Sequence, residues 1–170
     1  MVQTQRDIQS LLVEAGLHPR KRYGQNFLID GNLLRKLVAA AELQPTDVVL
    51  EVGPGLGALT RVLAERGARV IAVELDARIL PALRATTDAF ERVEVRHGDA
   101  MRFDHHSMPT GSLLIANLPY QISTALLADA LRSERYARMA ILVQREVAER
   151  IVAHPGDAVF GAFSLLCRHF

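Results

Sequence analysis

The sequence predicts an α/β fold in which a parallel sheet carries helices on both faces. Two observations lead to this prediction. Short apolar runs alternate with amphipathic segments over residues 46–170, and the unusual residues follow the ends of those runs. Strands that alternate with helices favour a parallel sheet, and right-handed crossovers bring the carboxyl ends of its strands to one edge. Ligands of such sheets bind along that edge, so we expect the functional site there.

The expected elements follow from the spacing of the apolar residues. Five apolar runs are the expected strands, at residues 48–50, 70–73, 93–95, 113–116 and 140–143. The segments between them predict helices near residues 57–66, 76–89 and 121–133. Upstream, helical spacing covers residues 4–15 and 30–41, and the second helix has one apolar face made by Leu33, Leu34, Leu37 and Val38. We therefore divide the chain into a helical and basic N-terminal segment, residues 1–45, and a core, residues 46–170.

Composition limits the class of protein. A chain of 170 residues that is 49% hydrophobic is long and apolar enough to fold around a core. No apolar run approaches the roughly 18 residues of a membrane span, and the N-terminus has no signal-peptide pattern. Cys167 is the only cysteine, which suits a reducing cytoplasm. The pair His105-His106 has no ligand partners nearby in sequence, so we interpret it as a surface loop and expect no metal.

A glycine-rich segment follows the first expected strand. Gly53 and Gly55, with Ala58 three residues later, fit the pattern of a nucleotide-binding loop, in which glycine lets the backbone approach a ligand closely. Glu74 ends the second strand, where a carboxylate can bind both hydroxyls of a ribose. These features fit NAD and S-adenosylmethionine about equally, and a tight turn without any ligand is the alternative.

Two further carboxylates favour a positively charged nucleoside. Glu51 lies at the end of the first strand beside the glycines, where it would repel a pyrophosphate and attract a sulfonium or an ammonium. Asp99 follows the third strand and can accept a hydrogen bond from an adenine amino group. Acidic residues at the ends of three strands suit S-adenosylmethionine better than NAD.

The fourth strand runs into Asn117-Leu118-Pro119-Tyr120. Asn and Pro are common in turns, so an ordinary turn is one interpretation. The other is methylation of an exocyclic amine, whose lone pair is delocalised into the ring. The Asn117 side chain and the Pro119 carbonyl could accept hydrogen bonds from that amine, and Tyr120 could stack on a base flipped out of its helix. Such a site needs no metal and no strong general base.

These motifs together resemble the ribosomal RNA adenine dimethyltransferases. Six blocks follow the family's order, at residues 23–28, 50–60, 73–76, 98–100, 117–123 and 144–150. The resemblance implies a Rossmann-like class I S-adenosylmethionine-dependent methyltransferase. With Gly55 from the glycine pattern, it implies that the cofactor contacts are Asn26, Leu28, Gly53, Gly55, Glu74, Asp99 and Asn117. It implies Asn117, Pro119 and Tyr120 as catalytic residues. The basic run Arg20-Lys21-Arg22 is a candidate RNA contact or a solvated turn.

Three positions favour the family's small-subunit branch over its macrolide-resistance branch, which modifies large-subunit RNA. They are Gly24, Leu56 and Leu118. The resemblance implies dimethylation of two adjacent adenosines near the 3′ end of small-subunit rRNA. The expected partner is that RNA or an immature small ribosomal subunit, bound by a monomer with no membrane contact. An NAD-dependent oxidoreductase and a non-enzymatic RNA-binding assembly factor are the alternatives.

The family continues beyond the length of this chain, with further strands and a small helical domain, so we expect the fold to be truncated. The strand at 140–143 should then lie at an edge of the sheet, beside the strand at 113–116. Apolar residues near the C-terminus could cover part of that edge: Phe160, Phe163, Leu165, Leu166 and Phe170. We expect such a chain to bind the cofactor but to be less stable, to self-associate and to bind RNA weakly.

Overall fold

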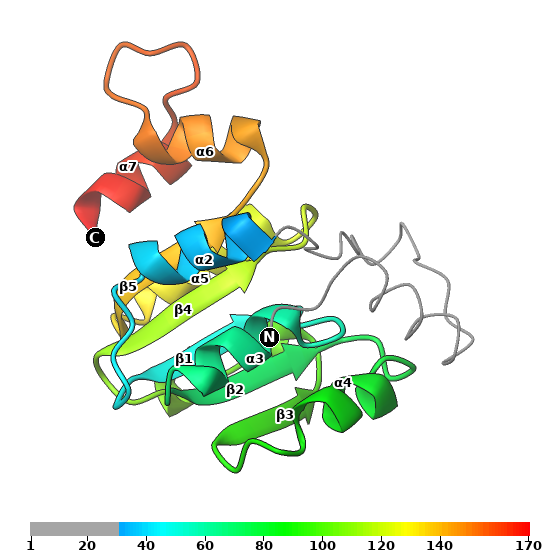
Figure 1. Ribbon diagram of the computed structural model, residues 1–170. Coiled ribbons are helices and arrows are strands. Elements are labelled where there is room, and N and C mark those ends of the chain that lie inside the picture. The colour runs from blue at the N-terminus through cyan, green and yellow to red at the C-terminus, as the bar shows by residue number, and fades with distance from the viewer. Residues whose placement is uncertain (1–30) are drawn as a thin grey trace.

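Five parallel strands form one sheet, in the order β3-β2-β1-β4-β5, in the computed structural model, which describes residues 31–170 (Figure 1). The strands are β1 (Val48–Val52), β2 (Arg69–Glu74), β3 (Val93–His97), β4 (Ser112–Asn117) and β5 (Tyr136–Leu142). The order reverses between β1 and β4, so the carboxyl ends of these two neighbouring strands flank the point where such sheets bind ligands. The parallel α/β sheet that the sequence predicts is confirmed.

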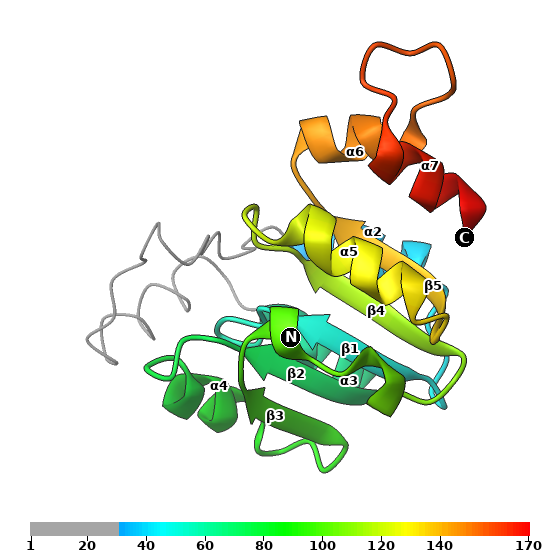
Figure 2. The same cartoon turned by 180° about the vertical axis from the view of Figure 1, so that it is seen from behind.

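Helices cover both faces of the sheet. The described helices are α2 (Gly31–Ala40), α3 (Ala58–Glu65), α4 (Leu80–Thr87), α5 (Ser123–Arg132), α6 (Arg145–Val152) and α7 (Ala162–His169), with short 3₁₀ turns η2 (Ala100–Arg102) and η3 (His105–Ser107). Figure 1 shows α2 and α3 in front of the sheet, and Figure 2 shows α5 on the opposite face. The helix α4 packs against β3 and α3.

The central strands bury both of their faces. Val49 and Ile115 belong to the core beneath α2 and α3, whereas Leu50 and Leu114 belong to the core beneath α5. Because neither face of β1 or β4 meets water, these strands appear in the sequence as continuous apolar runs. Because of this double burial, the ends of β1 and β4 expected from the sequence lie within about two residues of the observed ends.

One expectation about α2 is wrong. Its buried stripe is Leu34, Leu37 and Val38, and Ala41, directly after the helix, continues the i, i+3, i+4 and i+7 spacing of one helix face. Leu33 lies beside that stripe and is exposed. The helix itself is confirmed.

The fifth strand begins at Tyr136, four residues before the expected start at residue 140. It is an edge strand, paired only with β4 among the described strands. Its first half is partly exposed, and Arg138 forms an ion pair with Glu42 on the chain before β1. An edge strand needs no continuous apolar run, so the sequence pattern missed these residues.

The expected position of this strand at an edge beside β4 is confirmed. The expected cover by C-terminal residues is met in part, because Phe163 belongs to the core against which Met139 and Ile141 of β5 pack. The helix α7 packs against α5 and α6. Phe163 is buried in the core on the α5 side, whereas Leu165 and Phe170 are exposed. Across residues 31–170, every helix falls short of the length and apolar character that a membrane crossing requires.

The interpretation of His105 as part of a surface loop is wrong. His105 is buried, and its Nδ1 lies 2.6 Å from the Tyr136 hydroxyl oxygen. Its ring also meets Phe103 edge-on, and burial lowers the pKa of the imidazole. Within the described part of the chain, no group of three or more His, Cys, Asp or Glu side chains is placed to hold a metal ion.

Candidate functional site

The candidate site is built from the last residues of the central strands. Glu51, Glu74 and Asn117 stand at the carboxyl ends of β1, β2 and β4. Side chains alternate between the two faces of a sheet along each strand. Each of the three residues lies an even number of positions from residues of its own strand that pack beneath α2 and α3, as Glu51 does from Val49, so all three lie on that face. The fold therefore brings Glu51, the predicted cofactor contact Glu74 and the predicted catalytic asparagine to one side of one edge.

The glycine loop connects β1 to α3. Gly53 has φ +68°, and its N–H donates to the Val73 carbonyl at 3.0 Å, which continues the pairing of β1 with β2 into the loop. Gly57, at φ +84°, precedes α3, and a Cβ there would lie 2.9 Å from Thr86 Oγ1. The left-handed backbone at both positions requires glycine, as the sequence pattern indicated.

Glu74 ties this loop to the second strand. Its Oε2 accepts from the Gly55 N–H at 3.1 Å, and its Oε1 accepts from the Asp76 N–H at 2.9 Å. Burial raises the pKa of the Glu74 carboxyl, and the two backbone donors oppose the rise. The sequence predicted that Glu74 binds a ribose, and the structure gives it a second task, because it fixes the glycine loop before any ligand arrives.

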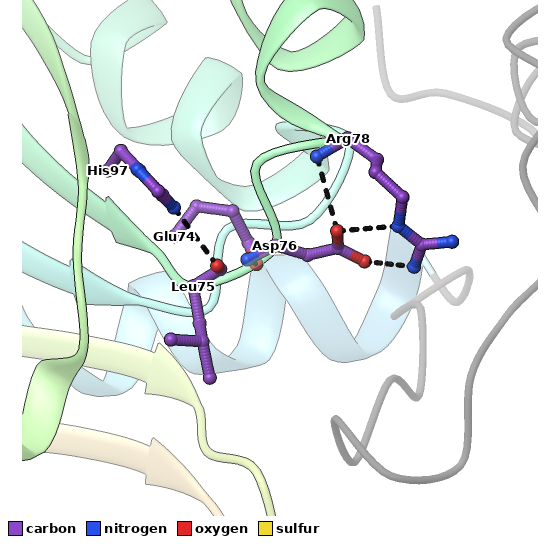
Figure 3. Close-up of polar contacts among 5 residues, drawn as sticks. All are labelled: Glu74, Leu75, Asp76, Arg78 and His97. Atoms are coloured by element: carbon purple, nitrogen blue, oxygen red, sulfur yellow. Dashed lines mark hydrogen bonds and ion pairs between the residues drawn. The ribbon is translucent and has the colours of Figure 1, made fainter.

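The turn after β2 holds two features that sequence reasoning missed (Figure 3). Asp76 is buried, and both its carboxylate oxygens pair with the Arg78 guanidinium, one of them at 2.8 Å from Arg78 Nε. Leu75 is 50% exposed, and its carbonyl lies 3.2 Å from His97 Nε2 at the end of β3. An exposed apolar side chain next to Glu74 offers a surface for the flat face of a base. Leu75 and Asp76 directly follow the carboxyl end of β2, and that place in the sequence would have indicated them as candidate site residues.

Asp99 occupies the expected place after β3. Its carboxylate caps η2 by accepting from the Met101 N–H at 2.9 Å through Oδ1. The side chain is half-buried. This capping bond fixes the carboxylate at the site edge, where the predicted contact with an adenine amino group stays a prediction.

The segment Asn117 to Tyr120 extends from β4 past the glycine loop. Pro119 Cγ would lie 3.5 Å from a Cβ placed on Gly53, so the proline ring lies directly over that glycine. The Pro119 carbonyl accepts from the Ile122 N–H at 3.3 Å, a long bond that leaves its second lone pair for another donor. Tyr120 is 44% exposed. The loops after β1 and β4, more than 60 residues apart in the sequence, thus form one site.

Glu51 is buried beneath this site, with only 1% of its surface exposed. Burial raises its pKa to about 8, and the nearby Glu74 adds to the rise. The side chain and backbone of Thr60 on α3 lie close enough to oppose this rise in pKa. Neither the Thr60 hydroxyl nor Glu51 Oε2, however, has a well-formed hydrogen bond with any described residue. A buried carboxylate oxygen without a partner fits a ligand that carries positive charge.

The remaining predicted site residues lie outside the described part of the chain. They are Asn26, Leu28, Arg20, Lys21 and Arg22. Their predicted roles in cofactor and RNA binding stay predictions.

Comparison with known proteins decides the family. Residues 16–170 match the model of the ribosomal RNA adenine dimethylase family. The chain belongs to this family. The resemblance inferred from the six sequence blocks is confirmed.

Members of the ribosomal RNA adenine dimethylase family with curated names resemble the chain over nearly its whole length. The ribosomal RNA small subunit methyltransferase A of Deinococcus radiodurans is 47% identical over 157 residues, which is 92% of this chain and 53% of that protein. The protein of the same name from Moorella thermoacetica is 42% identical over 173 residues, which is 95% of this chain and 60% of that protein. The chain therefore spans little more than half the length of these curated relatives.

Solved structures support the same fold. A dimethyladenosine transferase from Plasmodium falciparum matches with a TM-score of 0.70 and 30% identity, over 81% of this chain and 50% of that one. The 23S rRNA methyltransferase ErmE matches with a TM-score of 0.68 and 32% identity, over 74% of this chain and 50% of that one. The expected Rossmann-like methyltransferase fold is confirmed.

Proposed function

We propose that this chain carries the catalytic part of an S-adenosylmethionine-dependent rRNA adenine-N6 dimethyltransferase of the small-subunit branch. Its substrate is then a pair of adjacent adenosines near the 3′ end of small-subunit rRNA, in the naked RNA or in an immature subunit. The observation that carries the proposal is the packing of Pro119 over Gly53, which joins the expected catalytic loop to the expected cofactor loop. Membership of the adenine dimethylase family supports the chemistry.

The cofactor assignment rests on the charges around the glycine loop. A dinucleotide would place its pyrophosphate over the loop, close to the buried carboxyl of Glu51 and to Glu74. Neither carboxyl group can stabilise a polyanion, whereas both can stabilise a ligand with a sulfonium and an ammonium. Bound in this site, S-adenosylmethionine would supply an electrophilic methyl group.

The chain's own residues would prepare the target amine. Asn117 and the Pro119 carbonyl would accept its two hydrogens, which would make the nitrogen lone pair available and stabilise the positive charge that develops on it. Tyr120 would hold the flipped base by stacking, since almost half of its surface is exposed. The family resemblance puts Asn117, Pro119 and Tyr120 in these roles.

The small-subunit branch is preferred over the large-subunit branch on two grounds. The relatives from Deinococcus radiodurans and Moorella thermoacetica are both named small subunit methyltransferases. Of the three positions that favour this branch, Leu56 and Leu118 lie within the site loops and are both buried.

The N-terminal segment, residues 1–45, belongs to the same proposal. We infer that it completes the cofactor site through Asn26 and Leu28 and contacts RNA phosphates through Arg20, Lys21 and Arg22. A substrate in ribosomal RNA goes with a cytoplasmic monomer that meets this RNA during small-subunit assembly.

The proposal is tested by incubating the chain with S-adenosylmethionine and small subunits that lack the modification, followed by mass spectrometry of the RNA digest. Because we expect the chain to bind RNA weakly, both the chain and the subunits are used at high concentration, and we expect slow methylation. We expect N6,N6-dimethyladenosine at two adjacent positions. Asn117→Ala should lower the rate on the order of 10²-fold, as loss of one contact made in the transition state does. Asn32→Ala, at the exposed start of α2, is the matched control.

Three results would contradict the proposal. Equal rates for wild type and Asn117→Ala would remove the assigned role of the asparagine. Methylation of large-subunit RNA alone would favour the resistance branch. Tight binding to small subunits without any methyl transfer would favour a non-enzymatic assembly factor.

A further inference from the structure

Glu51 has an unusual environment for a carboxyl group. It lies one residue before the end of β1, beneath the glycine loop, and is almost completely buried. Its Oε2 has no hydrogen-bond partner among the described residues. A buried acceptor without a donor costs free energy, and an ionised one costs more. An apolar side chain at position 51 would avoid this cost in free energy, yet the chain has a glutamate there.

The described elements around Glu51 offer no cation to pair with it. Glu74 on β2 is the charged group that acts on it most directly, and it carries the same sign. On α3, Arg61 pairs with Glu65, and on α2 Arg35 and Lys36 are exposed to solvent. The strand β4 carries no titratable side chain. Burial and the neighbouring carboxyl therefore both favour the protonated form of Glu51 in the absence of ligand.

We propose that Glu51 is the charge sensor of the cofactor site: it holds a proton in the ligand-free chain and gives that proton to solvent when the cationic methionine end of the cofactor binds over the glycine loop. This inference rests on the proposed cofactor. Binding then replaces a buried neutral acid by a buried ion pair, and one O–H bond breaks as the proton passes to water or buffer. Direct contact is not needed, because an opposite charge within about 4–6 Å already favours the ionised form.

The direction of the pH dependence follows from this exchange. A site that releases a proton on binding gains affinity as pH rises, by up to about tenfold per pH unit below the pKa of the ligand-free group. That pKa is raised to about 8, so near pH 6.5 Glu51 is almost fully protonated before binding. The amino group of the ligand is still an ammonium at that pH, since α-amino groups titrate near pH 7.7–8.0.

Titration calorimetry at pH 6.5 tests the proposal. S-adenosylmethionine is titrated into the chain in phosphate, imidazole and ACES, three buffers with different ionisation enthalpies. The slope of the observed heat against ionisation enthalpy counts the protons released. We expect about one proton from the wild type and none from Glu51→Gln, which keeps the shape of the side chain but cannot ionise.

Two controls separate Glu51 from Glu74, whose pKa is also raised. The first is 5′-methylthioadenosine, which carries the ribose and base but neither the ammonium nor the sulfonium, and it should release no proton. The second is Glu74→Gln, which should bind more weakly yet still release a proton with S-adenosylmethionine. The comparison of S-adenosylmethionine with 5′-methylthioadenosine uses the wild-type chain alone, so it still tests the proposal if Glu51→Gln fails to fold.

The possible outcomes are distinct. Binding of S-adenosylmethionine without proton release, equal release from Glu51→Gln, or equal release with 5′-methylthioadenosine would each overturn the sensor role while leaving cofactor binding intact. The absence of any binding heat would overturn the cofactor assignment itself, and the inference with it.

Discussion

The two halves of the candidate site are held in place to different degrees. In the glycine-loop half, the Gly53, Gly55 and Gly57 N–H groups all donate within the fold, at 3.0, 3.1 and 3.0 Å. The Thr86 hydroxyl also holds the Leu56 carbonyl at 3.0 Å. In the Asn117-to-Tyr120 half, the Leu118 N–H donates to the Leu142 carbonyl at 3.0 Å, but the Pro119 carbonyl makes one long bond and the Tyr120 ring is substantially exposed.

This difference agrees with what each half would bind. A small cofactor binds more tightly to a loop that is already in its final shape, because less ordering is left to be done on binding. A base that must leave an RNA helix arrives with a large and variable partner, so the residues that receive it need exposed surface. We therefore expect substitutions in the first half to lower the stability of the fold, and substitutions at Tyr120 to affect function alone.

The largest effect on stability is expected from Gly57→Ala. A Cβ at this position would meet Thr86 Oγ1 at 2.9 Å and Leu83 Cδ1 at 3.0 Å, in a backbone with φ +84°. Left-handed strain costs about 1 kcal/mol and overpacking about 1–3 kcal/mol, so the free energy of unfolding should fall by roughly 2–4 kcal/mol. Urea denaturation followed by circular dichroism measures the loss.

Gly111→Ala is the matched control for this substitution. Gly111 has nearly the same φ, +88°, but a Cβ there would meet nothing within 4 Å. It should therefore show the cost of backbone strain alone, roughly 1 kcal/mol. Equal losses for the two variants would mean that the close packing of the glycine loop against α4 contributes nothing.

A smaller loss of stability is expected from Glu74→Ala, together with a loss of cofactor affinity. The substitution leaves the Gly55 and Asp76 N–H groups without their acceptor, at a cost of about 1–3 kcal/mol in the free energy of unfolding. Calorimetry should show S-adenosylmethionine binding weakened by about 1–3 kcal/mol, the range for a charge-assisted hydrogen bond. Glu91→Ala, on the exposed turn before β3, should change neither quantity. Unchanged affinity would leave Glu74 with a structural role only.

The sequence predicted the parts of the fold that depend on local burial. The strands β1, β2 and β4 were located closely because both of their faces are apolar. A polar residue near the end of each apolar run then marks the carboxyl edge of the sheet. These residues are Glu51, Glu74 and Asn117. The first half of the edge strand β5 is partly exposed and lacks this apolar signal, which is why it was missed.

The sequence could not predict contacts that depend on the pairing of distant segments. Pro119 lies over Gly53 because β1 and β4 are neighbours in the sheet, and nothing near either residue indicates this. His105 is buried because Tyr136, 31 residues later, supplies a hydroxyl to its ring. The two backbone bonds of Glu74 likewise depend on the folded shape of the glycine loop. Patterns in a sequence identify candidate residues, whereas their partners come from the topology.

The smallest effect on stability is expected at Tyr120, where the comparison of the two halves is tested most directly. Its side chain is 44% exposed, and its carbonyl, which Ser123 Oγ contacts at 3.2 Å, is retained in any variant. Tyr120→Ala should therefore change the free energy of unfolding by no more than about 0.5 kcal/mol, as surface substitutions do. The same substitution should cost about 1–3 kcal/mol in methyl transfer if a base stacks on the ring. Tyr120→Phe keeps the ring and should keep most of the activity. If Phe proves as damaging as Ala, the hydroxyl acts in the reaction and stacking is not the role of this residue. If Ala instead destabilises the fold as much as Glu74→Ala does, the exposed half of the site is as firmly built as the glycine loop, and the distinction between the two halves fails.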